Sequence, residues 1–321
     1  MPLDPQVRRY LQMAAILGEG PPTLEGRRAG LDGLGRLTGP PVPVAAVEPL
    51  ALPGAAGLLP ARLYRPLGRA DGTCLLYLHG GGFVGGGLDA HDGICRALAA
   101  ASGCTLVAAT YRLAPEHPFP AAVEDVRATL AAFAGEAASL GLDPGRLAVG
   151  GDSAGANLAA GLCLWARGRI AVAAQLLLCP VLDAAGEGES YRTLAAGYGL
   201  DRATLERDLA HYAGCADPGD PRLSPLRAPA LAGLPPTLIH TAAYDMVRDD
   251  GAAFAARLAA EGVPVRHTCH PGMIHHFYGM GGLIPYAREA LRAIGAELRE
   301  VLDAAPATPA RPPPAVAPPA A

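Results

Sequence analysis

The sequence predicts an α/β protein in which a mostly parallel sheet is covered by helices on both faces. Between residues 74 and 302, short runs of leucine and β-branched residues alternate with longer, alanine-rich stretches. Such short apolar runs are typical of buried parallel strands, and the longer stretches can form the crossover helices that parallel strands require. Half of the 321 residues are hydrophobic. The chain can therefore bury a core of the size that this architecture needs.

The expected elements follow one another along the chain in a regular order. Two antiparallel strands are expected first, over Val42–Leu52 and Ala61–Tyr64. The main sheet follows with six strands, expected over Leu75–Leu78, Thr105–Ala109, Leu147–Val149, Ala174–Cys179, Thr237–Thr241 and Val263–Thr268. Its helices are expected to include Ala121–Leu140, Ala154–Ala166, Ala252–Ala260 and Tyr286–Leu302. The repeated succession of strand and helix favours a sheet with helices on both faces.

Two segments interrupt this alternation. Residues 1–40 are amphipathic and rich in arginine, and residues 181–230 contain a helical stretch over Ser190–Ala213. We expect both to form a helical cap over the carboxyl edge of the sheet, since long insertions in compact domains are usually functional; two surface insertions without a role remain the alternative. The core is then divided into residues 41–180 and 231–303. Residues 304–321 consist mainly of alanine and proline and are expected to be a disordered tail.

Composition excludes several classes of function. The net charge is −4, without a long basic cluster, so neither nucleic acid nor a membrane is an expected partner. All 26 basic residues are arginine, which excludes Schiff-base, pyridoxal-phosphate and phosphate-loop chemistry that needs lysine. The seven cysteines never form a Cys-x-x-Cys pair and are expected in the core. The sequence contains no stretch typical of a leader peptide or of a membrane-spanning helix, so we expect a cytoplasmic protein. A leader peptide that was removed earlier is the alternative.

A serine bracketed by glycines is the most informative motif. Residues 151–155 read Gly-Asp-Ser-Ala-Gly, between a predicted strand and a predicted helix. A nucleophilic serine must protrude from a sharp, strained turn, and the close packing there favours glycine two positions to either side. Ser153 is therefore the candidate nucleophile.

A base and an acid for this serine follow it in the chain. The base candidate is His275, in a predicted loop over residues 270–277 after the last strand. The acid candidate is Asp245, shortly after the strand predicted at 237–241, where it would lie at the carboxyl edge beside the serine. Asp249 and Asp250 are rivals, but they fall in the first turn of the next helix, where acidic residues usually complement the helix dipole. Asp245 itself could instead be no more than the N-cap of that helix.

Backbone donors for an oxyanion are predicted at two places. Ala154 begins a helix, so its amide points toward the developing charge. Gly81 and Gly82 follow a strand within His79-Gly-Gly-Gly-Phe, where residues without Cβ let amides turn inward. The same segment also satisfies the dinucleotide pattern Gly-x-Gly-x-x-Gly over residues 80–85, but the next strand ends without an acidic residue for a ribose.

The remaining histidines have no obvious catalytic role in the sequence. His79 is expected to be a hydrogen-bonding strut for the glycine loop. Six others have no Cys, Asp or His partner at metal-ligand spacing, and they are His91, His117, His211, His240, His267 and His270. We therefore expect neither a metal nor a cofactor.

These motifs together resemble the hormone-sensitive-lipase-like branch of the α/β-hydrolases, which are mainly microbial carboxylesterases. The resemblance covers nearly the whole chain up to the tail. It rests on His79-Gly-Gly-Gly, on the stretch from Tyr111-Arg-Leu-Ala-Pro to Asp125, on the serine turn, on residues 245–249 and on residues 272–277. It implies an α/β-hydrolase fold with a helical cap, hydrolysis of short- to medium-chain acyl esters without a cofactor, and a small-molecule ester as partner.

The resemblance also carries over site by site. Ser153, Asp245 and His275 match the catalytic triad of the family. Gly81, Gly82 and Ala154 match its oxyanion donors. Many relatives pair through the sheet edge, so a homodimer is compatible with the resemblance.

Two positions depart from the family pattern. Met246 replaces the proline that usually follows the triad acid, and His276 stands where glycine usually follows the base. His276 is expected to line the pocket, with a role as competing base as the alternative. An amidase or N-acetyl deacetylase using the same triad, and a receptor without catalysis, are the alternative functions, because the pocket and not the fold selects the bond.

Overall fold

Residues 2–17, 23–68 and 71–304 are described by the structure, a computed structural model. They form an eight-stranded sheet with the strand order β1-β2-β4-β3-β5-β6-β7-β8. Its strands are β1 (Ala46–Gly54), β2 (Gly57–Arg65), β3 (Cys74–Leu78), β4 (Thr105–Ala109), β5 (Leu147–Asp152), β6 (Ala174–Leu178), β7 (Thr237–Tyr244) and β8 (Val265–Ile274). The pairs β1/β2 and β2/β4 are antiparallel and the other pairs are parallel. The sequence predicted this order of antiparallel strands before a parallel sheet correctly.

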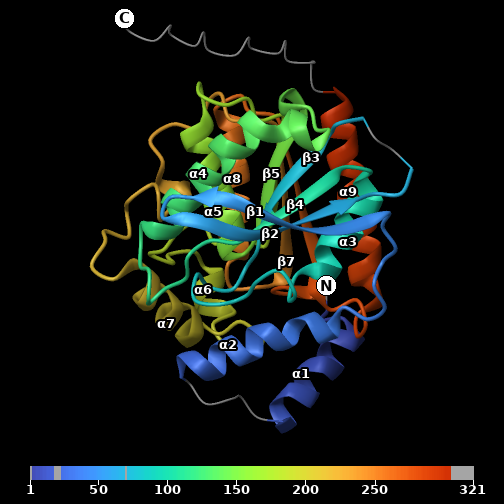
Figure 1. The fold of residues 1–321 in the computed structure, drawn as a ribbon. Coiled ribbons are helices and arrows are strands. Elements are labelled where there is room, and N and C mark those ends of the chain that lie inside the picture. Colours follow the sequence, from blue (N-terminus) through green and yellow to red (C-terminus); the bar gives the residue numbers. More distant parts are fainter. Residues whose placement is uncertain (1, 18–22, 69–70, 305–321) are drawn as a thin grey trace, which may run out of the picture.

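Helices cover both faces of the sheet (Figure 1). One face carries α4 (Ala121–Glu136), α5 (Ala154–Ala166) and α8 (Arg248–Ala260), and the other carries α3 (Asp92–Ser102) and α9 (Pro285–Ala304). The remaining α-helices of the described residues are α1 (Pro5–Leu17), α2 (Leu24–Gly33), α6 (Ser190–Thr193) and α7 (Arg202–Ala213). Short 3₁₀ turns occur at Leu34–Leu37, Ala137–Leu140, Pro144–Arg146, Pro225–Arg227 and Phe277–Gly279.

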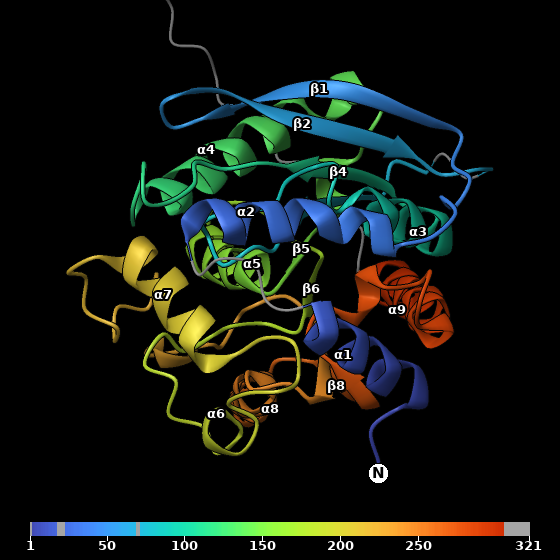
Figure 2. The same ribbon diagram turned by 90° about the horizontal axis from the view of Figure 1, so that it is seen from below.

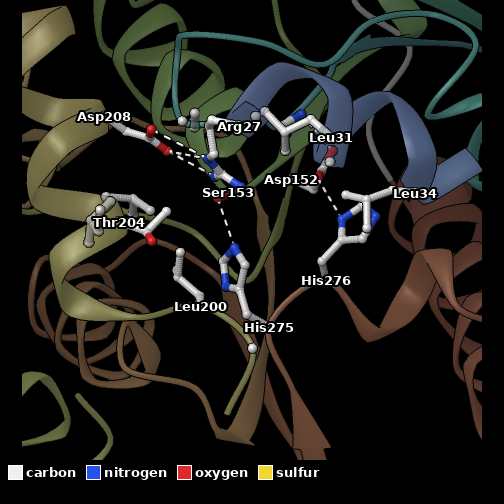
Figure 3. A pocket seen from close by; sticks show the side chains of 18 of the residues that line it. Arg27, Leu31, Leu34, Asp152, Ser153, Leu200, Thr204, Asp208, His275 and His276 are labelled. Carbon is white, nitrogen blue, oxygen red and sulfur yellow. Dashed lines mark hydrogen bonds and ion pairs between the residues drawn. The ribbon is translucent and has the colours of Figure 1, made fainter. Parts of the chain in front are cut away.

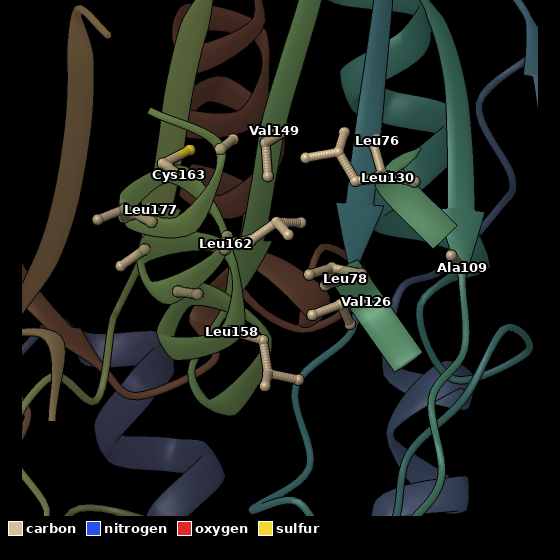
Figure 4. Close-up of a cluster of buried hydrophobic side chains, with 14 of the residues drawn as sticks. Leu76, Leu78, Ala109, Val126, Leu130, Val149, Leu158, Leu162, Cys163 and Leu177 are labelled. Atoms are coloured by element: carbon tan, nitrogen blue, oxygen red, sulfur yellow. The ribbon is translucent and has the colours of Figure 1, made fainter. Parts of the chain in front are cut away.

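The core between the sheet and α4 and α5 holds the serine turn in place. Leu76 and Val149 come from the sheet, and they face Leu130 of α4 and Leu162 of α5 (Figure 4). All four side chains are at most 1% exposed. Burying a side chain of this size stabilises a fold by about 1.5–3 kcal/mol. Strand β5 and helix α5, which meet at Ser153, are therefore fixed by packing on both sides of the turn.

Two expected elements differ from the observed ones. The stretch predicted as one helix over Ser190–Ala213 is split into α6 and α7, because Gly197 and Gly199 adopt φ angles of +86° and +94° that a helix cannot contain. The loop predicted over residues 270–277 begins as strand, since β8 continues to Ile274. Beyond an irregularity in its pairing with β7, Ile274 lies opposite Tyr244, so the strand carries the chain directly to His275.

Helices from two distant parts of the sequence gather at the end of the sheet where β3 and β5 finish. Figures 1 and 2 show α1 and α2 on the same side of the molecule as α6 and α7. Asn157 of α5 donates hydrogen bonds of 2.8 Å to the carbonyls of Val181 and Leu223, which bound much of the intervening segment. The tail was predicted from residue 304, but Ala304 is the last residue of α9. The rest of the predicted tail lies outside the described residues. No described helix is both long and apolar enough to span a membrane.

Candidate active site

Ser153 lies in a strained turn between β5 and α5. Its φ and ψ angles are +52° and −117°, a region that residues with a side chain rarely adopt. A Cβ atom on Gly151 would lie 2.4 Å from the carbonyl oxygen of Leu78, and one on Gly155 would lie 2.0 Å from it. Both positions therefore require glycine, for the packing reason inferred from the sequence.

The structure brings the three predicted triad residues into one hydrogen-bonded chain. His275 Nε2 is 2.9 Å from Ser153 Oγ, and His275 Nδ1 is 2.7 Å from Asp245 Oδ2 (Figure 3 shows the contact with Ser153). The carboxylate has no exposure and the imidazole is 10% exposed. Since a carboxylate accepts hydrogen bonds, Nδ1 carries the proton and Nε2 is free to accept one from the serine hydroxyl.

Asp245 also serves the backbone of its own turn. Its Oδ1 accepts a hydrogen bond of 3.1 Å from the amide of Val247, just before α8. The capping alternative is wrong, because Val247 is the N-cap residue of α8 and that helix has no side-chain cap. The two oxygens of Asp245 instead bind the turn before α8 and His275.

The rival carboxylates have other partners. Asp250 accepts hydrogen bonds from the amides of Leu182 and Asp183 and from the hydroxyl of Tyr191, while Asp249 accepts from the amide of Ser190. Both lie in the first turn of α8, as predicted. They tie the 181–190 segment to that helix and make no contact with His275 among the described residues.

The predicted oxyanion donors line the same pocket as Ser153. Gly81 and Gly82 have φ angles of +133° and +62°, and a Cβ on Gly82 would lie 2.1 Å from Asp208 Oδ2. The amides of Gly81, Gly82 and Ala154 donate to no other group among the described residues. Three unpaired amide donors beside a serine hydroxyl can receive a negatively charged oxygen. The glycines do not open a helix, since α3 starts later, at Asp92, so the dinucleotide pattern lacks its structural context.

A buried polar cluster lies beneath this loop. Asp152 Oδ1 accepts hydrogen bonds from Tyr77 Oη at 2.8 Å and from the Gly80 amide at 3.0 Å. Its Oδ2 lies 3.3 Å from His91 Nε2 and 3.4 Å from His276 Nδ1. Burial acts to raise the pKa of Asp152, but the two neighbouring imidazoles outweigh it and hold that pKa well below its usual value.

The histidines beside this cluster are largely shielded from solvent, with His79 buried and His276 11% exposed. His79 stacks on Tyr111 with ring centroids 4.5 Å apart, and its Nδ1 donates to the carbonyl of Gly80 at 2.8 Å, the contacts of a strut. Burial, and then the proximity of His91, lower the pKa of His79 to about 4. Burial also lowers the pKa of His276, which lines the pocket on the side of Asp152.

The pocket above Ser153 has a volume of about 250 Å³, and two segments distant in the sequence supply much of its wall. Tyr10, Leu31 and Leu34 come from the N-terminal segment, and Leu200 and Leu205 come from the 181–230 segment. Arg27 of α2 pairs with Asp208 of α7 across it, with Nη2 and Oδ2 2.8 Å apart (Figure 3). Burial raises the pKa of Asp208 despite the opposing effect of Arg27.

The sequence analysis did not identify Arg27 and Asp208 as residues of the pocket wall. No motif marks Arg27 or Asp208, and their contact joins positions 181 residues apart. His91 and Asp152 were missed for a similar reason, since neither has a partner at metal-ligand spacing in the sequence. The arginine-rich, amphipathic character of residues 1–40 was the available signal for the N-terminal wall.

Comparison with known proteins yields a consistent set of relatives. Residues 75–279 match a family model described as an alpha/beta hydrolase fold. The carboxylic ester hydrolase LipN of Mycobacterium tuberculosis is 39% identical over 279 residues, which cover 83% of this chain and 74% of LipN. The ethyl acetate hydrolase of Pseudomonas putida is 39% identical over 251 residues, covering 76% of this chain and 79% of that protein.

Solved structures give the same result. An alpha/beta hydrolase from the metagenome of Lake Arreo, Spain, superimposes with a TM-score of 0.89 at 38% identity, covering 93% of this chain and 98% of that chain. The thermophilic carboxylesterase EstE1, cloned from a metagenomic library, superimposes with a TM-score of 0.83 at 36% identity, covering 87% and 98% of the two chains.

Proposed function

The chain belongs to the α/β-hydrolase family, in its hormone-sensitive-lipase-like branch, and is a carboxylic ester hydrolase; from this premise we propose that it cleaves short- to medium-chain acyl esters through Ser153, His275 and Asp245. The observation that carries the proposal is the continuous hydrogen-bonded chain from Ser153 Oγ through the imidazole to the buried carboxylate. Such a chain can remove the serine proton during attack on a carbonyl.

Each group has a defined part in the proposed reaction. Ser153 Oγ attacks the ester carbonyl carbon while His275 Nε2 takes its proton. The imidazolium then gives this proton to the departing alcohol, and an acyl-enzyme remains. Water, deprotonated by the same imidazole, hydrolyses the acyl-enzyme and restores the serine. Asp245 keeps the imidazole in the required tautomer and stabilises its charged form.

The negative charge that develops on the carbonyl oxygen needs fixed donors. We assign this task to the amides of Gly81, Gly82 and Ala154, which have no competing acceptor among the described residues. The Ala154 amide also lies at the N-terminus of α5, whose dipole favours negative charge. The loss of one such donor typically raises the barrier by about 3–4 kcal/mol.

The dimensions of the pocket favour small substrates. Its volume of about 250 Å³ is below the roughly 300–1,000 Å³ usual for sites that take drug-sized ligands. Its walls are mainly apolar and include leucines from both flanking segments. We therefore expect acetyl and butyryl esters to be better substrates than palmitoyl esters.

The test is hydrolysis of a p-nitrophenyl ester series from acetate to palmitate by the wild type and by Ser153→Ala. We expect turnover of the short esters and its loss, on the order of 10⁶-fold in kcat, in the variant. The methyl group of alanine is smaller than the hydroxymethyl group of serine, so the variant should fold without a steric clash. An unchanged far-ultraviolet circular dichroism spectrum is the control for this. Activity retained in the variant contradicts the assignment of Ser153. Faster cleavage of p-nitroacetanilide than of p-nitrophenyl acetate would instead indicate an amidase.

A further inference from the structure

We propose that His91, Asp152 and His276 form a binding site for a divalent transition-metal ion of the zinc class beneath the glycine loop. The three residues come from the segment before α3, the end of β5 and the turn after β8. Their candidate ligand atoms are His91 Nε2, Asp152 Oδ2 and His276 Nδ1, all within 4.8 Å of one another. The proposal does not depend on the catalytic role of Ser153.

Two of the three separations between these atoms match those of metal ligands. Ligand atoms about 2.0–2.1 Å from a tetrahedral zinc ion lie about 3.3–3.4 Å from each other. Asp152 Oδ2 lies 3.3 Å from His91 Nε2 and 3.4 Å from His276 Nδ1. Both separations are long for a charge-assisted hydrogen bond, which is usually about 2.7–2.9 Å.

The contacts of His91 turn its Nε2 toward the carboxylate of Asp152. His91 Nδ1 lies 3.0 Å from the carbonyl oxygen of Gly87, which accepts and cannot donate, so Nδ1 carries a proton. The Gly80 amide lies 3.2 Å from His91 Nε2 and 3.0 Å from Asp152 Oδ1, so it donates mainly to the carboxylate. His91 Nε2 faces Asp152 Oδ2 at 3.3 Å and donates a proton to it in a hydrogen bond when no ion is bound. A cation between the two atoms would take the place of that proton.

The surrounding groups orient two of the three candidate ligands, His91 and Asp152, as second-shell groups do in metal sites, whereas His276 Nε2 has no hydrogen-bond partner among the described residues. A histidine ligand usually donates its other ring N–H to a carbonyl or carboxylate, which fixes the tautomer, and Gly87 does this for His91. Asp152 Oδ1 is held by Tyr77 and by the Gly80 amide, which leaves Oδ2 for the ion. With an ion bound, the Gly80 amide would donate its hydrogen bond to Asp152 Oδ1, which is closer to it than His91 Nε2.

His276 occupies a position that is costly for a histidine. Its backbone adopts φ +58° and ψ +17°, the left-handed region, which typically costs 1–3 kcal/mol for a residue with a side chain. Gly279 makes room for its ring, since a Cβ at Gly279 would lie 2.4 Å from His276 Nε2. A strained backbone and a cleared space together indicate that this imidazole has a role at its present place.

The ion would be reachable from the pocket. His91, Asp152 and His276 all line the cavity that contains Ser153, and Figure 3 shows His276 and Asp152 together on one side of it. A water molecule from the cavity can complete the fourth position of a tetrahedral site. Two imidazole nitrogens and one carboxylate oxygen suit zinc, whereas magnesium requires about six oxygen ligands.

A second cluster must be distinguished from this one. Cys179, Asp245 and His275 also bring ligand atoms within 4.8 Å of one another, but that aspartate and that histidine already hydrogen-bond to each other at 2.7 Å. Cobalt(II), a spectroscopic substitute for zinc, separates the two, because a thiolate ligand adds an intense ultraviolet charge-transfer band. We expect cobalt to give a tetrahedral visible spectrum without this band.

The experiment measures zinc and cobalt binding to untagged protein by equilibrium dialysis with metal analysis. The background is the Ser153→Ala variant, so the result is independent of turnover and of the proposed function. We expect one zinc ion per chain, no magnesium, and an increase in Tm with zinc. The variant His276→Gly should bind at least about tenfold more weakly. Glycine favours the left-handed backbone there, so this variant is expected to fold.

The exposed His117, changed to alanine, is the matched control for the loss of one histidine and should leave binding unchanged. The absence of bound zinc, or equal binding by His276→Gly, would overturn the proposal. So would loss of the ion in Cys179→Ser, which would assign it to the other cluster.

Discussion

The ion pair between Arg27 and Asp208 offers the sharpest test of how the segments above the pocket are held. Arg27 Nε and Nη2 lie 3.0 and 2.8 Å from Asp208 Oδ2, and the side chains are 29% and 4% exposed. Arg27→Met would keep the length and helix propensity of the side chain but leave the buried carboxylate without its partner. Among the described residues, the hydrogen bonds to this carboxylate come from Arg27.

The cost of the change lies between two limits. Removing one partner of a fully buried ion pair costs about 3–5 kcal/mol, and an exposed pair contributes about 0–1 kcal/mol. Since Arg27 is nearly a third exposed while Asp208 is buried, we expect Arg27→Met to lower the free energy of unfolding by about 2 kcal/mol. Asp208→Asn should cost less, because the guanidinium can turn toward solvent. The double variant should be close to Asp208→Asn and more stable than Arg27→Met.

Urea denaturation of the four proteins measures this cycle. The pH dependence supplies a second check, because burial already raises the pKa of Asp208 and the loss of Arg27 raises it further. A carboxyl group with a raised pKa in the folded state takes up a proton as the pH falls, which removes the unpaired charge. The penalty in Arg27→Met should therefore shrink between neutral pH and about pH 5. An additive double variant, or a penalty independent of pH, would refute this reasoning.

Two further predictions concern the triad and a buried histidine. Asp245→Asn should lower kcat for p-nitrophenyl acetate by about 10⁴-fold, because asparagine favours the wrong tautomer of the His275 imidazole. The asparagine carbonyl can still accept the hydrogen bond from the Val247 amide, so Tm should change little. A small effect on kcat would exclude the proposed role of Asp245. His240, against His270, His267 and Glu297, has its pKa lowered to about 3, first by burial and then by the other two histidines. Because the unfolded chain then binds a proton that the folded protein does not, stability falls as the pH drops below about 6.5, by about 1.4 kcal/mol per pH unit for this group. His240→Asn should lessen that slope in urea denaturation, and an unchanged slope would contradict the assignment.

The residue types that the serine turn requires could be predicted from the sequence. Ser153 must leave the strand at a positive φ, and the glycines on either side face the carbonyl of Leu78 too closely for any Cβ. Such a demand acts within five consecutive residues, so it restricts residue types at fixed positions. The order of strands and helices was predictable for the same reason, because apolar runs and their spacing are local properties.

The limits of local reasoning appear in the helical stretch and in the last strand. Glycines at 197 and 199 lie at positive φ between α6 and α7, within a stretch predicted as one helix. The pairing of β8 with β7 extended a strand through a proline and a glycine. Both outcomes depend on backbone conformations and strand partners that short-range propensity does not determine.

The sequence by itself determined the hydrolase fold, the serine turn and the three residues of the hydrogen-bonded chain that we propose as the triad, because each depends on short motifs with a strict steric or chemical demand. The tertiary structure decided the pairing of Arg27 with Asp208, the convergence of His91, Asp152 and His276, and the size of the pocket. These contacts join residues more than 60 positions apart. Their geometry arises when the packed sheet and its helices bring distant segments together, which no local pattern encodes.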